Sequence, residues 1–224
     1  MDARTKIIVA DDHPLFREAL IHAIKGCVGA ADVVEAATLE SLQDAVEDHV
    51  DADLLLLDLH MPGVTGFSAL AYIRNRREML PTVIVSANDE PATIRRAIQH
   101  GASGFIPKSS GMETIEAALG AVIAGSVWVP DGVALEATRL DQKEQSNADA
   151  LADLTPHQFR VLLMIAEGLM NKQIAYQLGV SEATIKAHVT AILKKLGVNN
   201  RTQAVLAVKS LDVEQKAFNG TADG

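Results

Sequence analysis

The sequence predicts an α/β unit, with a doubly wound parallel sheet of five strands, followed by a small all-α unit of four helices. In residues 1–128, short apolar runs alternate with segments of helical spacing, and the most apolar run is four consecutive leucines at 54–57. A strand that is apolar on both faces is typical of a parallel sheet covered by helices on both sides. Beyond residue 151 the apolar spacing is helical throughout, which predicts the second unit.

The first unit is predicted to alternate strand and helix along the chain. Pro14 and Pro91 are typical first residues of helices, and Gly101 is a typical helix terminator. The predicted strands are residues 6–10, 33–34, 54–57, 82–85 and 104–106. The predicted helices are one from Pro14, then 39–48, one around 67–73, 91–99 and 112–124.

Polar side chains stand at the ends of four of these strands: Asp11 with Asp12, then Asp58, Ser86 and Lys108. Right-handed crossovers place the carboxyl ends of parallel strands at one edge of the sheet, where ligands bind. Clustered carboxylates need a cation, and Mg²⁺ prefers oxygen ligands. An ammonium and a hydroxyl beside that ion suit a phosphoryl group, which makes Asp58 the natural nucleophile for an aspartyl phosphate.

Residues 1–128 resemble the receiver domain of two-component response regulators. The resemblance is carried by Asp11-Asp12, Asp58, Met61-Pro62-Gly63, Ser86-Ala87, and Lys108 preceded by Phe105. It implies that Asp58 is the phosphoacceptor and that Asp12 binds Mg²⁺ beside it. Asp11 would assist, and the backbone carbonyl of His60 would be a further ligand.

The same resemblance assigns the remaining polar groups and one aromatic residue. Ser86 and Lys108 would contact the phosphoryl oxygens, and Phe105 would turn inward as a switch residue. Phe105 as plain core is the alternative. The side chain of His60 is expected to face solvent in a loop, and His13 to line the rim or cap the following helix.

The charge of the chain is unevenly distributed, although the net charge is −9. Residues 1–128 hold 10 Lys and Arg against 18 Asp and Glu, whereas residues 171–209 hold six basic residues and one acidic one. An acidic body followed by a basic module indicates two tasks, the second with an anionic partner. The single cysteine, Cys27, and the absence of an apolar leader favour a cytoplasmic protein without membrane contact.

The predicted linker spans residues 129–150, because 140–150 is polar, aperiodic and at most partly helical. The second domain is predicted over 151–211 and a disordered tail over 212–224. Thr155 caps the first helix, with Gln158 completing a capping box. Asn171 is the predicted cap of the second helix and Ser181 that of the third. The glycine turn between the second and third helices indicates a helix-turn-helix.

The third helix of this domain divides into an apolar stripe and an outward face of small and basic residues. The stripe, which includes Ile185 and Ile192, is predicted to be core. The opposite face and its flanks suit a helix lying in the major groove, with methyl groups for thymine and lysines for guanine or phosphates. The predicted DNA contacts on this helix are Thr184, Lys186, Ala187, Thr190, Ala191, Lys194 and Lys195.

Residues 154–208 resemble the LuxR-type helix-turn-helix, and the two halves together resemble the NarL/FixJ class of response regulators. The match runs through Leu154-Thr155-Pro156, Asn171-Lys172-Gln173-Ile174-Ala175, Thr184-Ile185-Lys186, Lys195-Leu196-Gly197-Val198 and Arg201-Thr202-Gln203-Ala204. It adds Lys172 and Arg201 to the predicted DNA contacts. Thr190 occupies a position that is often basic in the family, so the base preference is expected to differ.

The function predicted from the sequence is transcription regulation switched by phosphorylation, without an enzymatic activity of its own. A sensor histidine kinase would phosphorylate Asp58, and the phosphorylated chain would bind promoter DNA as a homodimer. One alternative is a regulator that uses its receiver only for phosphorylation-independent dimerisation. Another is a phosphohydrolase, which would want a carboxylate two residues after Asp58, where His60 stands.

Overall fold

The structure is a computed structural model of the chain that describes residues 4–135 and 141–213. A parallel five-stranded sheet in the order β2-β1-β3-β4-β5 forms its first half, as predicted. The strands are β1 (Thr5–Ala10), β2 (Ala31–Ala36), β3 (Leu54–Asp58), β4 (Thr82–Ser86) and β5 (Gly104–Pro107). The helices between and after them are α1 (Pro14–Val28), α2 (Leu39–Asp48), α3 (Ser68–Arg76), α4 (Pro91–Gln99) and α5 (Met112–Ile123).

Two apolar layers enclose the sheet. The α1 and α5 helices pack on one face, where Ile24 and Leu119 are fully buried with alternate residues of the central strands. The other face joins a second cluster, which contains α2 and α3 and continues into the C-terminal half. All five residues of β3 and of β4 are buried, as expected for strands covered on both sides.

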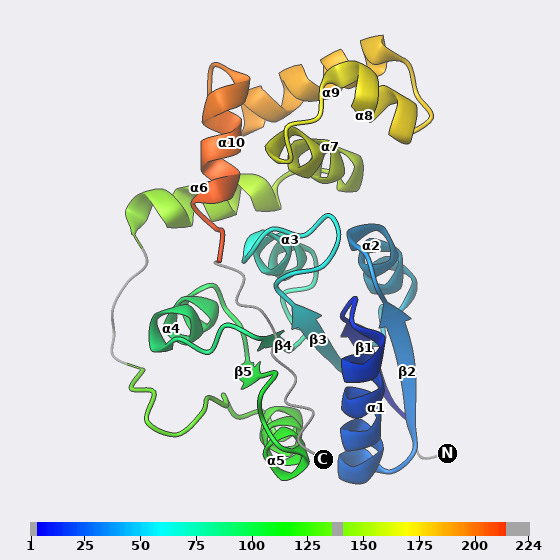
Figure 1. Cartoon of the computed structure of the whole chain (residues 1–224), viewed down its shortest axis with the longest axis vertical. Helices are drawn as coiled ribbons and strands as arrows, with labels where there is room; N and C mark the ends of the chain where they lie inside the picture. Colours follow the sequence, from blue (N-terminus) through cyan, green and yellow to red (C-terminus); the bar gives the residue numbers. More distant parts are fainter. Residues whose placement is uncertain (1–3, 136–140, 214–224) are drawn as a thin grey trace, which may run out of the picture.

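The C-terminal half consists of helices above the receiver-like half in Figure 1. They are α6 (Gln142–Ala152), α7 (Pro156–Ala166), α8 (Asn171–Gln177), α9 (Glu182–Lys195) and α10 (Arg201–Lys209). Thr155 caps α7 in a capping box with Gln158, and Ser181 accepts from the Thr184 N–H at the start of α9. The predicted cap Asn171 is wrong: Met170 is the cap residue and Asn171 the first helical residue.

The predicted linker, 129–150, was expected to be partly helical at most, and α6 occupies its residues 142–150. This helix is capped by Asp141 and packs along α3. Arg76 at the end of α3 donates to the carbonyl oxygens of Ala152 and Leu154, which close α6. A polar sequence without obvious periodicity thus becomes helical because a partner helix covers its few apolar residues, Ala148 and Leu151 among them.

The predicted disordered tail differs from expectation at its first two residues, Asp212 and Val213. The predicted disordered tail at 212–224 lies outside the described residues from 214 onward. Val213 is 5% exposed, and its carbonyl oxygen lies 2.9 Å from His60 Nε2 in the first half of the chain. Asp212 and Val213 therefore belong to the folded structure.

Candidate functional site

Three charged side chains from separate strand ends meet at the carboxyl edge of the sheet. In the parallel register Ala10 pairs with Leu57, so Asp11 and Asp58 follow as neighbours. Lys108 stands one residue beyond β5, and its Nζ lies 2.8 Å from Asp58 Oδ2 and 2.8 Å from Asp11 Oδ2. The structure thus brings together side chains from the beginning, the middle and the end of the domain's sequence.

Burial determines the electrostatics of this cluster. The side chains of Asp11, Asp58 and Lys108 are between 1% and 4% exposed. Burial raises the pKa of the Asp58 carboxyl above its ordinary value, although the nearby Lys108 ammonium lowers it. One ammonium thus faces two buried carboxylates, and the site is short of positive charge.

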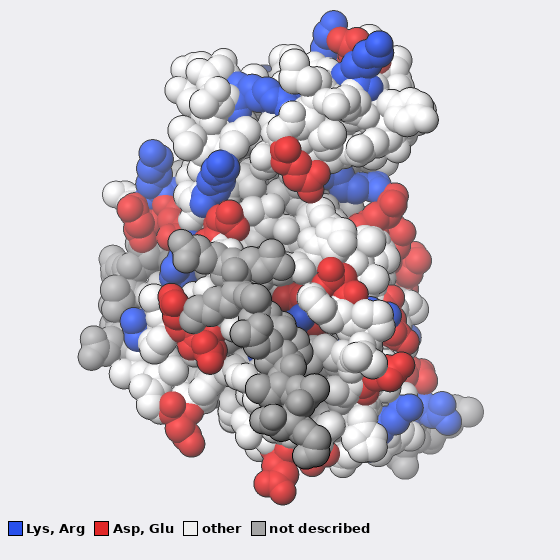
Figure 2. Space-filling model, viewed as in Figure 1, with Lys and Arg blue, Asp and Glu red and all other residues white. Residues whose placement is uncertain are grey.

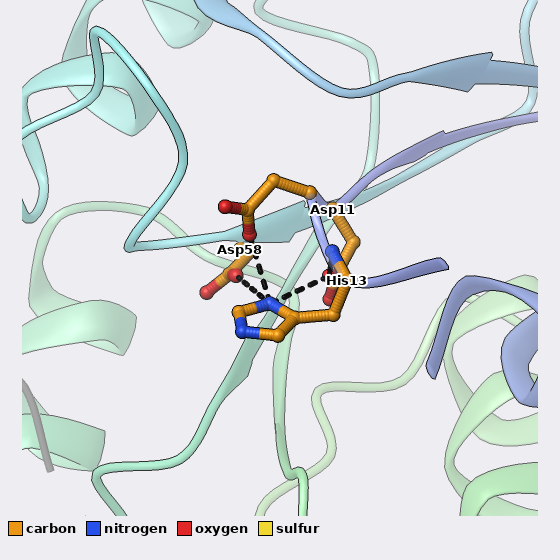
Figure 3. Close-up of side chains that lie close together, drawn as sticks. Asp11, His13 and Asp58 are labelled. Atoms are coloured by element: carbon orange, nitrogen blue, oxygen red, sulfur yellow. Dashed lines mark hydrogen bonds and ion pairs between the residues drawn. The ribbon is translucent and has the colours of Figure 1, made fainter. Parts of the chain in front are cut away.

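Asp12 and His13 complete the cluster at its solvent side. The Asp12 side chain is 29% exposed, and His13 Nδ1 lies 2.8 Å from Asp12 Oδ1 and 3.3 Å from Asp11 Oδ1. The same nitrogen is 3.9 Å from Asp58 Oδ2, so the imidazole is aimed at the carboxylates (Figure 3). His13 lies on the rim, as predicted, but makes no side-chain cap on α1. In the sequence, the place of His13 beside these carboxylates is indicated only by its position directly after Asp11 and Asp12.

The donor set of the cluster fits a hard divalent cation. Asp11, Asp12, His13 and Asp58 each offer an atom within 4.8 Å of the others. Among the described residues, Asp11 Oδ2 and Asp12 Oδ1 accept no hydrogen bond of acceptable geometry, and their neighbours at 2.8 Å are Lys108 Nζ and His13 Nδ1. The His60 N–H donates to Asp58 Oδ1 at 3.1 Å, which fixes the loop after β3 beside the same carboxylate.

Ser86 and Phe105 flank Asp58 on the next two strands. Asp58 pairs with Val85, so Ser86 stands one residue beyond it, and Ser86 pairs with Pro107. Ser86 is fully buried, and its Oγ accepts from the Asn88 N–H at 3.1 Å. The ring of Phe105 is fully buried within β5. Its N–H donates to the Trp128 carbonyl at 3.0 Å, so the only tryptophan packs at the end of the sheet.

The side chain of His60 is partly buried, which differs from the expected solvent-facing position. Its Nε2 lies 2.9 Å from the carbonyl oxygen of Val213, at the end of the described chain. The position two residues after Asp58 therefore carries a ring engaged by the protein itself and not a free acid–base group.

The outward face of α9 is open in this structure. Thr184, Lys186, Ala187, Thr190 and Lys194 are exposed and Ala191 is partly exposed, whereas Ile185 and Ile192 are buried. Within the described part of the chain, Lys186 forms an ion pair with Glu182 of its own helix, at 3.0 Å. Figure 2 shows Lys and Arg gathered at the end of the molecule formed by α8 and α9, with Asp and Glu spread over the sheet half. Lys172 on α8 is also exposed.

Two of the predicted DNA contacts also make hydrogen bonds to other parts of the protein. Lys195 Nζ donates to the Asp153 carbonyl at 2.8 Å. The Arg201 guanidinium donates to the Leu169 carbonyl and to Asn171 Oδ1. Lys195 thus closes α6, and Arg201 ties α10 to the loop before α8. As DNA contacts both residues remain predictions, because Lys195 is exposed and Arg201 partly exposed, and hydrogen bonds to backbone carbonyls do not exclude contact with DNA.

Among the described residues, 4–135 and 141–213, no helix combines the length and the apolar character that a bilayer-spanning segment requires.

Family models match both halves of the chain. Residues 7–120 match the response regulator receiver domain, and residues 152–208 match the bacterial regulatory proteins of the luxR family. A glycerol metabolism activator of Pseudomonas putida is 41% identical over 212 residues, which are 92% of this chain and 96% of that protein. The nitrate/nitrite response regulator NarL of Escherichia coli (strain K12) is 31% identical over 203 residues, 90% of this chain and 94% of that protein.

A solved structure with the same two halves supports the assignment. RcsB from Salmonella enterica serovar Typhimurium, bound to a promoter with a phosphomimetic, is 26% identical with a TM-score of 0.54. The match covers 93% of this chain and all of that one. The chain therefore belongs to the two-component response regulators of the NarL/FixJ class, which join a receiver domain to a LuxR-type DNA-binding domain.

Proposed function

We propose that Asp58 accepts a phosphoryl group from a sensor histidine kinase and that this step controls promoter binding. The observation that carries the proposal is the buried cluster in which Lys108 Nζ lies 2.8 Å from both Asp58 and Asp11. A carboxylate oxygen of Asp58 attacks phosphorus, and the bond from phosphorus to the kinase imidazole nitrogen breaks. The Lys108 ammonium remains close to the new phosphoryl oxygens and offsets part of their charge.

We propose Mg²⁺ as the cation of this site, held by Asp11, Asp12, Asp58 and the backbone carbonyl of His60. The carboxylate oxygens of Asp11, Asp12 and Asp58, which lie within 4.8 Å of one another, support this assignment. When bound, the ion would neutralise the carboxylates and orient the phosphoryl oxygens. His13 Nδ1 touches the same carboxylates, and its side chain is 49% exposed, so the ring can swing outward.

Phosphorylation replaces one carboxylate by a group with about two negative charges at neutral pH. Ser86 is the neighbouring hydroxyl at the edge of β4 and would donate to the new oxygens. Phe105, which is fully buried on the neighbouring strand β5, is the proposed switch residue. This sequence of contacts would pass the change toward α4.

We propose that the outward face of α9 enters the major groove of promoter DNA. Lys172 of α8 would contact the backbone beside it. Small residues such as Ala187 allow close approach, and Lys186 and Lys194 are placed to reach phosphates or guanine. A homodimer would read two half-sites about one helical turn apart. A solved structure of two RcsB dimers on two DNAs, at 26% identity and TM-score 0.56, supports that mode. Work on chromosomal DNA implies the cytoplasm.

The phosphoacceptor is tested with the full chain, magnesium and a small phosphoryl donor. The wild type should gain one phosphoryl group by intact mass, and Asp58→Asn should gain none. Asp44→Asn, at an exposed carboxylate on α2, should be labelled as the wild type is. Stable labelling of Asp58→Asn would remove Asp58 from this role.

The DNA face is tested by the salt dependence of promoter binding. Lys186→Ala and Lys194→Ala should weaken binding and reduce the slope of log affinity against log salt by about one each. Lys25→Ala, an exposed lysine on α1, should change neither quantity. Wild-type binding by both α9 variants would refute the groove assignment.

Phosphorylation-independent DNA binding is a second candidate, because the receiver does not cover the outward face of α9 in this structure. In that case the receiver would serve only as a dimerisation module. The DNA affinity of one preparation, measured before and after phosphorylation, separates the candidates: equal affinities would favour the second.

A further inference from the structure

The basic part of the DNA-binding domain contains one acidic side chain, and it lies on the helix that is proposed to enter the groove. Residues 171–209 hold six Lys and Arg, and Glu182 is their one acidic residue. Glu182 is the first residue of α9, directly after the cap Ser181, and it is exposed. Phosphates repel a carboxylate, so Glu182 would oppose DNA binding unless a hydrogen-bond donor of the DNA satisfies it.

Glu182 lies one helical turn before Lys186 on the same side of α9. The two side chains form an ion pair, with 3.0 Å between Lys186 Nζ and Glu182 Oε1. They are 66% and 48% exposed, so the pair is open to water and contributes little to stability. The pair therefore presents a hydrogen-bond donor and an acceptor side by side to the surroundings of α9. In Figure 2, acidic and basic atoms lie next to each other at the end of the molecule formed by α8 and α9.

Nearby hydroxyl groups of α9 are already engaged within the helix. The hydroxyl oxygens of Ser181 and Thr184 lie 2.8 Å apart, and Ser181 Oγ also accepts from the Thr184 N–H at 3.1 Å. The Thr190 hydroxyl donates to the carbonyl oxygen of Lys186 at 3.0 Å. The carboxylate of Glu182 is thus the charged acceptor that the start of α9 offers to a groove.

The major groove contains a matching partner for such a pair. A G·C base pair presents acceptors at guanine O6 and N7 and a donor at the cytosine N4 amine. Carboxylates typically accept from cytosine N4, lysines donate to guanine, and adenine is typically bound by Asn or Gln amides. One helical turn advances about 5.4 Å and one base-pair step about 3.4 Å. Glu182 and Lys186 can therefore reach the same base pair or two neighbouring ones.

We propose that Glu182 determines part of the DNA sequence specificity: its carboxylate accepts a hydrogen bond from the N4 amine of a cytosine in each half-site, and Lys186 faces the paired or adjacent guanine. The proposal rests on the proposed function, because it needs α9 in the major groove. Where the cytosine amine is present, the carboxylate is satisfied. Where no amine stands opposite, a desolvated carboxylate lies among phosphates and base acceptors, which weakens binding to DNA of the wrong sequence.

The direct test is the selection of duplexes from a random pool by phosphorylated full-length protein, as wild type and as Glu182→Ala. The wild type should select a fixed C·G pair in each half-site and discriminate against other pairs there about fivefold or more. Glu182→Ala should lose this preference and keep the others. Glu167→Ala, at an exposed glutamate that ends α7, is the matched control and should select as the wild type does.

Modified bases then identify the atom that is recognised. N4-methylcytosine at the selected position blocks the amine hydrogen that points into the groove, whereas 5-methylcytosine leaves it free. The wild type should bind the N4-methylated duplex about fivefold more weakly than the 5-methylated one, and Glu182→Ala should not distinguish the two. Equal base preferences in the wild type and Glu182→Ala would overturn the proposal. Loss of a preference for an A·T pair in Glu182→Ala would overturn the assignment to cytosine.

A duplex that lacks the selected site separates base recognition from a purely structural role of Glu182. Without the carboxylate there is no repulsion from phosphates, so Glu182→Ala should bind this duplex about twofold to threefold more tightly at low salt. An acidic residue that served only to stabilise the first turn of α9 would act in the opposite sense, because its loss would weaken binding to every duplex alike. Uniformly weaker binding by Glu182→Ala would therefore overturn the proposal.

Lys194→Ala distinguishes a failure of this proposal from a failure of the groove assignment. Lys194 is exposed on the same helix, and its loss should weaken binding to all duplexes and reduce the salt slope by about one. If Lys194→Ala does so while Glu182→Ala keeps every base preference, the role of Glu182 is refuted and α9 still lies in the groove. If both variants bind all duplexes as the wild type does, the groove assignment and the role of Glu182 are both refuted.

Discussion

At the scale of single residues, the phosphorylation site is a balance between one buried cation and two buried anions. Lys108 is held between Asp58 and Asp11, and the deficit of positive charge is built into the fold. A buried charge without a partner is far more costly than a buried pair. Substitutions of the two kinds of charge should therefore act in opposite directions.

Lys108→Ala should destabilise the receiver by about 3–5 kcal/mol in the absence of metal, because it leaves two carboxylates unpaired. Asp58→Asn should keep or increase stability, because burial already opposes the charged form of this carboxyl. Chemical denaturation of both variants without metal measures the two effects. A Lys108→Ala protein as stable as Asp58→Asn would contradict this account of the site.

His100 on the receiver is a residue whose protonation should affect stability. It is buried, and its Nε2 lies 2.7 Å from Glu144 Oε1 of α6. Burial lowers the pKa of His100 below its ordinary value near 6.5, although the hydrogen bond with Glu144 raises it. With the folded-state pKa lowered, the unfolded chain binds more protons. The stabilisation is therefore present above the ordinary value and is lost as the pH falls through the folded-state pKa.

We therefore expect thermal stability to fall between about pH 7 and pH 5, and to fall less in His100→Gln, which has no such proton to bind. Melting curves at several pH values test this, with His22→Gln on α1 as a histidine control. An identical pH dependence in the wild type and His100→Gln would show that other groups dominate.

At the scale of elements, the sheet and its strand ends follow from the sequence because their determinants are local. Continuous apolar runs specify β3 and β4, and the handedness of the crossovers then places Asp11, Asp58 and Lys108 at one edge. The capping box at Thr155 and the cap at Ser181 are equally local.

Contacts between elements could not be predicted in this way. Nothing in the sequence around Lys195 or Arg201 shows that carbonyl groups of Asp153 and Leu169 will take their charges. In the same way, the packing of α6 along α3 and the contact of His60 Nε2 with the Val213 carbonyl are not signalled by the local sequence. Each of these depends on which surfaces meet, and that information is spread over the whole chain.

At the scale of the whole molecule, one apolar cluster runs through both domains. Tyr72 of α3 stacks on Phe159 of α7, with ring centroids 4.3 Å apart, and the Arg76 guanidinium carbon lies 3.8 Å from the Tyr72 ring centroid. Arg160 of α7 also pairs with Glu40 of α2. The unphosphorylated protein should therefore unfold as one cooperative unit.

Tyr72→Ala should divide this single transition into two, because it removes the stacked pair at the centre of the shared cluster. Differential scanning calorimetry tests the change, and the other tyrosine of the chain supplies the control. Tyr176 is 88% exposed on α8, and Tyr176→Ala should unfold as the wild type does. One transition in both variants would mean that the remaining contacts suffice to couple the domains.

The exposed face of α9 has a consequence for the protein before it is phosphorylated. With Lys186 and Lys194 in contact with water, a molecule that has received no signal can already sample any duplex it meets, weakly and without regard to base order. Before a signal arrives, the protein would slide along chromosomal DNA in weak, non-specific association and would not diffuse freely. Phosphorylation would then have only to convert weak, non-specific DNA binding into stable binding at specific sites.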